Sequence, residues 1–210
     1  MELSTGLRER TESAMDKAEI EAYLLEVDEA LARAFPSKEP IRVLVVGGAC
    51  LLLAGVTRRV TSDIDVIITD LEGTGEASLV YQLTPTTKRM RKIISAVGKR
   101  RGLPSKERMV LNDDCALFLL DMGFLPQAQL FQAYRKLHVY LPADLGYILG
   151  CKLMAARPSK DEEDIQVLCQ RLGIYTRRQA QALLNRYFPN PGTQLLHQAP
   201  QTLDRLFSNG

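Results

Sequence analysis

Histidine and cysteine are scarce in this sequence, and their scarcity argues against several classes of site. The chain of 210 residues has two histidines and four cysteines. No two cysteines share a Cys-x-x-Cys spacing, so the sequence argues against a zinc site. Three of the four cysteines lie among apolar residues, and we therefore expect reduced core side chains in a cytoplasmic protein.

Long hydrophobic runs are also missing. The apolar run Val43–Thr57 contains three glycines and is shorter than the roughly 20 residues that a membrane-spanning helix needs. The first residues lack the apolar core and cleavage site of a signal peptide. We therefore expect no membrane partner. The composition, 46% hydrophobic and 25% charged, predicts a globular protein.

The small net charge of +2 is the balance of two oppositely charged segments. Residues 1–40 hold ten acidic and five basic side chains, and residues 88–108 hold nine basic side chains and one acidic one. A phosphate backbone interacts with such a local cluster, not with the total charge. The basic segment is either a nucleic-acid surface or a solvated helix face. If the acidic N-terminal helix packs against it, the argument for RNA becomes weaker.

Hydrophobic periodicity predicts an α+β fold. Helices are expected over residues 13–35, 49–54, 86–101, 144–156, 160–171 and 176–187. Strands are expected over residues 43–46, 63–69, 109–111 and 138–141. Residues 71–78 are rich in glycine and predict a loop. We divide the chain into an N-terminal helix (1–40), an α/β core (41–141) and a helical region that closes a cleft (142–210).

The most informative motif is a pair of aspartates on a predicted strand. Residues i and i+2 of a strand project from the same face, so Asp63 and Asp65 present two carboxylates together while Ile64, Val66 and Ile68 face the core. Carboxylate oxygens suit Mg²⁺ or Mn²⁺, with substrate phosphates completing the coordination. Upstream, Gly47-Gly48 allows a ligand to approach the backbone, and the next helix offers N–H groups to an anion.

These motifs carry a family resemblance. Gly47-Gly48, a predicted helix and then the segment Thr61-Ser62-Asp63-Ile64-Asp65-Val66 resemble the signature of the DNA polymerase β nucleotidyltransferase superfamily. Fourteen residues separate Gly48 from Asp63, a spacing similar to the minimal prokaryotic branch that includes AbiEii-type toxins. The resemblance implies a small mixed sheet with flanking helices, and an Asp63–Asp65 pair that binds magnesium and a nucleoside triphosphate. It also implies that Gly47, Gly48 and Ser62 contact that nucleotide.

A lysine within an apolar helix face is the second unusual feature. Lys152 shares its predicted face with Leu145, Ile148 and Leu149, and a buried charge needs a partner. One interpretation is a structural ion pair with Asp164 that joins two helices. The other is that Lys152 points at nucleotide phosphates and that Asp161 or Asp164 orients it. The pattern Lys152-Leu-x-Ala, then Arg157, then Lys160-Asp161 with Asp164 is similar to the same toxin-like branch.

Two further sets of residues remain open at this stage. The superfamily usually supplies a third carboxylate; the possibilities are Asp113, Asp114 and Asp121, and we favour Asp113 because it follows a strand-like run. A structure without a third acid near Asp63 and Asp65 would favour a catalytically silent relative. Arg58 and Arg59 lie between the glycines and the aspartates, where they either contact phosphates or belong to a solvated loop; of the two, we favour Arg58 as a contact of the nucleotide.

The resemblance and the residues together predict a metal-dependent transfer of a nucleoside monophosphate to a hydroxyl. The basic residues 88–108 favour RNA, plausibly tRNA, as the acceptor. The toxin-like branch also implies an antitoxin protein as a partner. The alternatives are transfer onto a small molecule such as an aminoglycoside, which would require an acidic acceptor pocket, and a silent nucleic-acid- or protein-binding relative.

Overall fold

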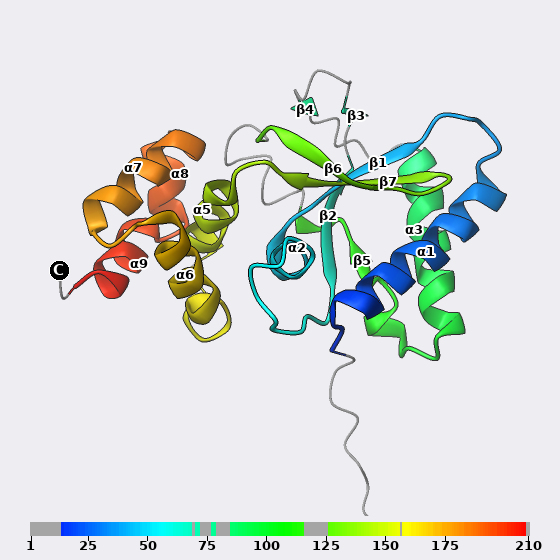
Figure 1. The fold of residues 1–210 in the computed structure, drawn as a ribbon, viewed down its shortest axis with the longest axis horizontal. Helices are drawn as coiled ribbons and strands as arrows, with labels where there is room; N and C mark the ends of the chain where they lie inside the picture. Colours follow the sequence, from blue (N-terminus) through cyan, green and yellow to red (C-terminus); the bar gives the residue numbers. More distant parts are fainter. Residues whose placement is uncertain are drawn as a thin grey trace, which may run out of the picture.

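A mixed β-sheet and a group of C-terminal helices make up the molecule. The computed structural model describes residues 14–68, 70–71, 77–78, 85–115, 126–155 and 157–208. The helices of residues 145–206 gather at one end of the sheet, on the left in Figure 1. This arrangement confirms the predicted α+β fold with a small mixed sheet, flanking helices and a helical C-terminal region.

The central sheet has five strands in the order β5-β2-β1-β7-β6. They are β1 (Ile41–Val45), β2 (Ile64–Ile68), β5 (Leu111–Asn112), β6 (Ala128–Ala133) and β7 (Leu137–Pro142). The β1–β2 and β6–β7 pairs are antiparallel, and the β1–β7 and β2–β5 pairs are parallel. The short strands β3 (Asp70–Leu71) and β4 (Ala77–Ser78) pair separately, within the region predicted as a loop.

The helix α1 (Lys17–Ala34) packs against the helix α3 (Pro85–Arg100) and the strand β7. It begins at Lys17 because Asp16 and Glu19 form a reciprocal capping box. Its buried Asp28 accepts hydrogen bonds from the backbone N–H groups of Lys136 (2.6 Å) and Leu137 (2.7 Å), which fixes α1 to the β6–β7 turn. The acidic helix is therefore part of the core domain.

The basic helix α3 (Pro85–Arg100) buries one face against the rest of the domain, with Met90, Ile94 and Val97 nearly fully buried. A 3-10 turn, η1 (Ser105–Glu107), connects it to β5. A Cβ atom on Gly98 would lie 2.5 Å from the carbonyl oxygen of Arg108, so the connection returns directly across the helix. This return places residues 101–110 beside the start of β2, where the backbone N–H of Ile64 donates to Val110 (2.7 Å).

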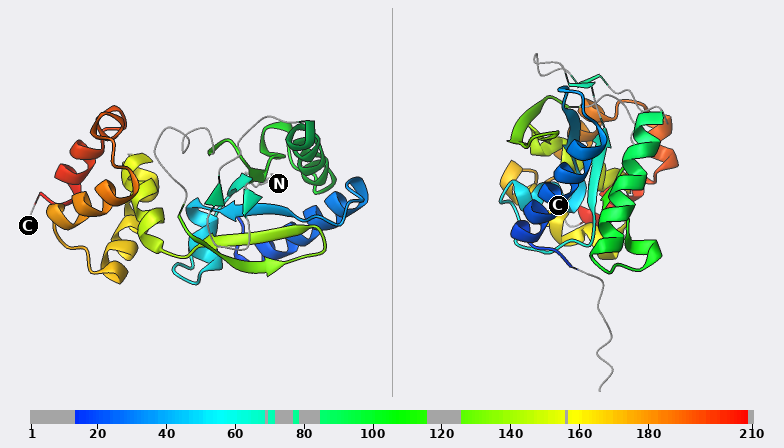
Figure 2. Two further views of the ribbon diagram at one scale, coloured as in Figure 1. Left: turned by 90° about the horizontal axis from the view of Figure 1, so that it is seen from above. Right: turned by 90° about the vertical axis from the view of Figure 1, so that its right-hand side faces the viewer.

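The C-terminal region consists of α5 (Leu145–Ala155), α6 (Pro158–Leu172), α7 (Arg177–Tyr187), α8 (Pro191–Leu196) and α9 (Ala199–Leu206). Figure 2 shows the same helices beyond the end of the sheet from a second direction. Most side chains of α5 are buried. This helix contacts α6, α7 and α9 on one side, and α2 (Gly47–Leu53) and β7 on the other. The helix α5 therefore joins the two parts of the molecule.

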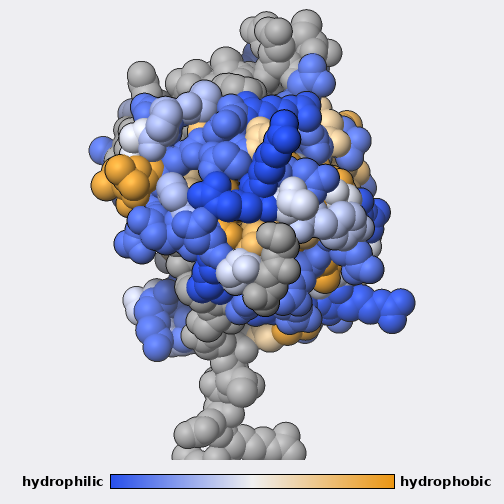
Figure 3. All heavy atoms as spheres, turned by 90° about the vertical axis from the view of Figure 1, so that its left-hand side faces the viewer, coloured by the Kyte–Doolittle hydropathy of each residue, from blue (hydrophilic) through white to orange (hydrophobic). Residues whose placement is uncertain are grey.

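The outer surface of the helical region is mostly hydrophilic, with small separated hydrophobic spots (Figure 3). Exposed large hydrophobic side chains in this region include Tyr175, Leu195 and Leu196. In the part of the chain that the structure describes, no helix combines the length and apolarity needed to cross a membrane. All four cysteines are free, and burial raises the pKa of Cys50 to about 12.

Candidate active site

The glycine turn at the end of β1 is shaped around Asp65. The helix α2 (Gly47–Leu53) begins at Gly47, two residues before the predicted start. Gly47 has a φ of +64°, and a Cβ atom there would lie only 2.6 Å from Oδ2 of Asp65. At Gly48 a Cβ atom would lie 3.3 Å from Oγ1 of Thr61. The carboxylate of Asp65 therefore occupies space that any side chain at position 47 would need.

Asp63 lies directly before β2 and Asp65 lies within it, and both side chains are half-buried. Between them Ile64 is fully buried, which agrees with the predicted alternation. Ile67, on the opposite face of the strand, is also buried because both faces of the sheet are covered at this point. Ile68, which was expected to face the core, is only partly buried. The segment before Asp63 is fixed by paired backbone hydrogen bonds between Met15 and Thr61 (2.6 and 3.0 Å).

The electrostatic environment of Asp65 favours its protonated form. Burial, and next the negative charge of Asp63, raise the pKa of Asp65 to about 6. The positive charges of Arg157, Lys160 and Lys152 oppose this rise without overcoming it. Two carboxylates are therefore held close together with incomplete compensation by the protein, and a bound cation would relieve their repulsion.

This raised pKa predicts that Asp65 destabilises the protein without ligands above pH 6. The folded pKa of about 6 exceeds the usual aspartate value of roughly 3.9, so ionisation costs more in the folded state, and the cost is complete above pH 6. Asp65→Asn should therefore raise the free energy of unfolding by about 1–3 kcal/mol at pH 8, with the gain disappearing by about pH 4. Urea denaturation across this pH range measures the difference.

The matched control for this prediction is Asp204→Asn, which removes an exposed carboxylate on α9. It should show no comparable pH-dependent gain. An Asp65→Asn gain of equal size at pH 4 and pH 8 would contradict the prediction, because it would come from packing and not from ionisation.

Across the cleft, a buried lysine is held between two buried aspartates. The Nζ atom of Lys152 on α5 lies 2.9 Å from Oδ1 of Asp161 and 2.7 Å from Oδ2 of Asp164, both on α6. The exposed fractions of the three residues are 5%, 1% and 6%. The ion pair between helices expected from the sequence is therefore present, and it involves both aspartates.

These groups line one open cavity of about 600 Å³ between the sheet and helices α5 and α6. Asp63 and Asp65 lie on the sheet side, and Lys152, Asp161 and Asp164 lie on the helical side. Gly48 and Ser62 line the same cavity, whereas Gly47 lines a smaller adjoining one that also contains Asp65 and Lys152. The structure thus brings most of the predicted site residues together.

Three further cations line the cavity, and for one of them, Arg59, the sequence left a phosphate contact open. They are Arg59, Arg157 and Lys160. The guanidinium of Arg157 lies 2.8 Å from Asp161, and Arg59 donates to the backbone oxygen of Lys160 (3.0 Å). Arg58, the arginine predicted to contact phosphate, is exposed and does not line the cavity. Which of these two adjacent arginines lines the cavity depends on the path of an irregular loop. Hydrophobic periodicity does not predict such a path.

Asp113, the favoured third metal-binding carboxylate, does not line this cavity. Asp113 is 3% exposed, and its Oδ1 atom accepts a hydrogen bond from Arg91 of α3 (2.7 Å). Instead, Asn112 pairs with Asp65 across the β2–β5 ladder, so these two side chains share a face. Within the described residues no group of three acidic, histidine or cysteine side chains is placed to hold a metal ion, and Asp121 lies outside them.

The basic segment is partly neutralised by other parts of the domain. Arg101 makes two hydrogen bonds to Glu26 of α1 (2.8 and 3.1 Å), and Arg91 pairs with Asp113 and Asp114. Arg89 lies over the ring of Phe35. The exposed basic residues of this segment for which no such pairing is found are Lys88, Lys92, Lys99 and Arg100. The packing of α1 on α3 therefore weakens the case for RNA without removing it.

A match to a known protein family covers the part of the site that lies on the sheet. Residues 22–94 match the model of a family described as a nucleotidyltransferase of unknown function (DUF6036). The match spans about a third of the chain; it includes the glycine turn and Asp63–Asp65 and ends before Lys152. Comparisons with curated proteins and with solved structures gave no significant match. The family match supports nucleotidyl transfer as the general activity and a nucleotide as the substrate.

Proposed function

We propose that this protein transfers a nucleoside monophosphate from a nucleoside triphosphate to a hydroxyl group, in the cavity between β2 and α5–α6. One observation carries the proposal: the Asp63–Asp65 pair, set against a glycine turn, faces a cluster of cations across a single cavity. Negative charge on one wall suits a metal ion, and positive charge on the other suits the triphosphate that this ion accompanies.

The donor set fits Mg²⁺ or Mn²⁺. Both ions prefer oxygen ligands, and the raised pKa of Asp65 beside Asp63 indicates carboxylates that are crowded in the absence of a cation. Asp63 and Asp65 would hold the ion. When bound, it would neutralise charge on the reacting phosphate.

The cations of the opposite wall would bind and orient the triphosphate. Lys160 and Arg157 are exposed at this wall, so their side chains can reach the phosphate oxygens of a triphosphate in the cavity. Lys152 donates a hydrogen bond to Asp161 and forms an ion pair with Asp164, and these two contacts hold its ammonium group at the cavity wall. Asp161 and Asp164 are therefore positioning residues in this proposal.

The proposed transfer replaces one phosphorus–oxygen bond by another. The acceptor oxygen forms a bond to the α-phosphorus while the bond from this phosphorus to the pyrophosphate oxygen breaks, and pyrophosphate leaves with the electron pair. The hydroxyl proton passes to water. Asn112 pairs with Asp65 from the neighbouring strand β5, and its amide cannot act as a base for that proton.

RNA, plausibly tRNA, is the acceptor that we propose, and a role as the toxin of a toxin–antitoxin pair follows from the family resemblance. The exposed lysines of α3 support RNA, although α1 neutralises part of that surface. The carboxylates and cations of the site are compatible with a cytoplasmic enzyme that uses cellular Mg²⁺. An antitoxin protein would be its partner.

A silent nucleotide-binding protein is the second candidate function. The described part of the chain places no third acid with Asp63 and Asp65, and this observation favours it. Such a protein would bind a nucleoside triphosphate through the same cavity and release it unchanged.

The test is a transfer assay with Mg²⁺, each α-labelled nucleoside triphosphate and total tRNA. The wild type should label the RNA, and Asp63→Asn and Asp65→Asn should each lower the rate by at least about 100-fold. Asp204→Asn, on the outer helix α9, should leave the rate unchanged. Nucleotide binding that depends on Mg²⁺ and Asp65 without transfer would establish the silent candidate, and transfer that survives Asp65→Asn would refute the proposed site.

A further inference from the structure

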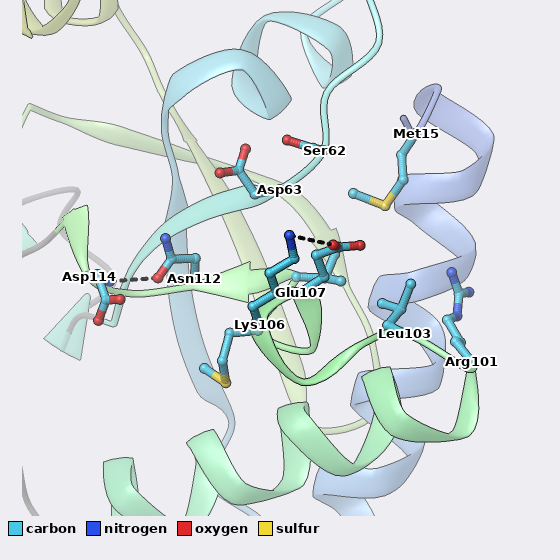
Figure 4. A pocket seen from close by; sticks show the side chains of 11 residues that line it. Met15, Ser62, Asp63, Arg101, Leu103, Lys106, Glu107, Asn112 and Asp114 are labelled. Atoms are coloured by element: carbon cyan, nitrogen blue, oxygen red, sulfur yellow. Dashed lines mark hydrogen bonds and ion pairs between the residues drawn. The ribbon is translucent and has the colours of Figure 1, made fainter. Parts of the chain in front are cut away.

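Negative charge beside the catalytic carboxylates argues against RNA phosphates binding there. A second cavity of about 530 Å³ adjoins the first one at Asp63, and residues 101–110 form one side of it. Both of its cations, Arg101 and Lys106, already pair with a glutamate. Its acidic lining residues are Asp63, Glu107 and Asp114, drawn in Figure 4. The phosphates of an RNA strand therefore need cations elsewhere on the protein.

A separate cavity, the distal cavity, lies at the end of the sheet away from the C-terminal helices. It encloses about 400 Å³ between the loop after α1 and the turn from β6 to β7, both on the right in Figure 1. Three of its lining residues, Lys38, Arg135 and Lys136, are basic. In the described part of the chain none of the residues that line it is acidic. The charge of its walls therefore suits an anion.

One wall of the distal cavity is a buried lysine whose ammonium group forms no ion pair within the described residues. Lys136 is only 4% exposed, and this group donates to Oγ of Ser37 (2.9 Å) and to the carbonyl oxygens of Ser37 (3.0 Å) and Glu39. All three acceptors are neutral. The buried carboxylate of Asp28 accepts instead from backbone N–H groups of the turn, and the side chain of Glu39 does not line the cavity. An anion in the cavity would therefore compensate a buried charge.

Three exposed cations surround the same cavity. Lys38 and Arg135 line it, and Arg89 of α3 lies over the ring of Phe35, another lining residue, 4.9 Å from the ring centroid. In the described chain none of these three basic side chains forms an ion pair. Their charges are therefore available to a ligand, unlike the charge of Arg101, which a glutamate neutralises.

A row of exposed lysines on α3 extends the positive surface beyond the distal cavity. Lys88, Lys92 and Lys99 are spaced i, i+4 and i+11, which places them within roughly 40° of one another around the helix axis. The row is about 16 Å long at 1.5 Å per residue, and it begins beside Arg89. A cavity that continues into a row of cations suits a chain of phosphates better than a single small anion.

We infer that the distal cavity and the lysine row of α3 bind the backbone phosphates of an RNA strand. This inference rests on the RNA acceptor of the proposed function. Lys38, Arg89 and Arg135 hold one phosphate at the cavity, and the lysine row contacts its neighbours. Contacts to phosphates position an RNA without reading its bases. A folded RNA such as tRNA spans the core domain, so it can lie on this surface while its reacting hydroxyl reaches the catalytic cavity.

The experiment measures binding of a fluorophore-labelled tRNA to the full chain by fluorescence anisotropy at several salt concentrations. The double variant Lys38→Gln with Arg135→Gln removes two exposed charges from the distal cavity. It should weaken binding by about 10-fold and reduce the slope of the logarithm of affinity against the logarithm of salt concentration by about 1–2. Absence of tRNA binding by the wild type would overturn the inference.

The matched control removes the same amount of charge at the other end of the molecule. Arg171→Gln with Arg178→Gln changes two exposed side chains, one on α6 and one on α7. This double variant should leave the Kd for tRNA within about 2-fold of the wild type. Equal losses in both double variants would show that only the net charge attracts RNA, and they would overturn the inference.

The outcomes separate this inference from the proposed function. RNA binding needs no catalysis, so a binding loss confined to the distal variant, without any label transfer, would contradict only the proposed function. If RNA is labelled, the distal variant should raise the KM for RNA about 10-fold and leave kcat unchanged, because its cations lie away from the reacting atoms. Label transfer with an unchanged KM would contradict only the distal surface. Binding to vesicles of phosphatidylglycerol in place of tRNA would assign the surface to a membrane and overturn the inference.

Discussion

Replacement of Lys152 by methionine is expected to lower the free energy of unfolding by about 3–5 kcal/mol. The ammonium group lies within 3 Å of two carboxylates that are almost completely buried, 2.9 Å from Asp161 and 2.7 Å from Asp164. Asp161 would keep Arg157 at 2.8 Å, but Asp164 would retain only Arg59 at 4.0 Å. An uncompensated buried carboxylate costs several kcal/mol, a large part of the roughly 5–15 kcal/mol that stabilises an ordinary domain. Urea denaturation measures the loss.

Lys160→Met is the matched control, since it removes an exposed lysine from the same cavity. Its effect on stability should stay within about 0.5 kcal/mol. If both lysine variants lower stability equally, the buried position of Lys152 is not the cause of the loss.

A double variant separates the structural role of Lys152 from its proposed role in binding phosphate. Lys152→Met with Asp164→Asn removes the carboxylate that is left without a close partner, and it should recover about 1–3 kcal/mol. Nucleotidyl transfer by this stabilised protein should nevertheless remain at least about 100-fold below that of the wild type. Recovery of activity together with stability would assign Lys152 a purely structural role.

Gly47→Ala is expected to reduce nucleotidyl transfer about 100-fold, while the protein remains folded. The new methyl group would lie 2.6 Å from Oδ2 of Asp65 and would displace this carboxylate from its position beside the turn. The left-handed backbone at φ +64° adds about 1–2 kcal/mol of strain for a residue with a Cβ atom. Initial rates and urea denaturation measure the two effects.

Gly55→Ala is the control that isolates the contact from the strain. Gly55 has nearly the same backbone angle, φ +66°, and a Cβ atom there would meet nothing within 4 Å. Both variants should therefore lose similar stability, but only Gly47→Ala should lose activity. Similar activity losses in both variants would show that backbone strain at either end of α2, and not the position of Asp65, controls the reaction.

Local sequence patterns predict much of the site because its parts depend on local periodicity. The alternation around Asp63 and Asp65 follows from the geometry of one strand, and the structure places both residues at the start of β2. In the same way, the helical spacing that put Lys152 among apolar residues indicated a buried ion pair, and α5 and α6 form that pair. Both inferences depend only on the spacing of residues that are close together in the sequence.

Pairings between distant segments could not be predicted in this way. The strand β5 has two residues, too few to show which of Asn112 and Asp113 faces the site. That choice depends on register: the hydrogen bonds between β2 and β5 align Asn112 with Asp65, and Asp113 then turns toward Arg91. The β6 strand, α8 and α9 were not predicted from periodicity.

The sequence by itself determined the carboxylate pair, the glycine turn and the position of the buried lysine on its helix, because these depend on neighbours along the chain. Only the tertiary structure decided that α1 neutralises part of the basic segment through Glu26, because Glu26 and its partner Arg101 are 75 residues apart in the sequence. It also decided that a second cavity opens beside Asp63, because the return of residues 101–110 across Gly98 creates that space. The charge of a segment is fixed by composition, but its availability to a partner is fixed by packing.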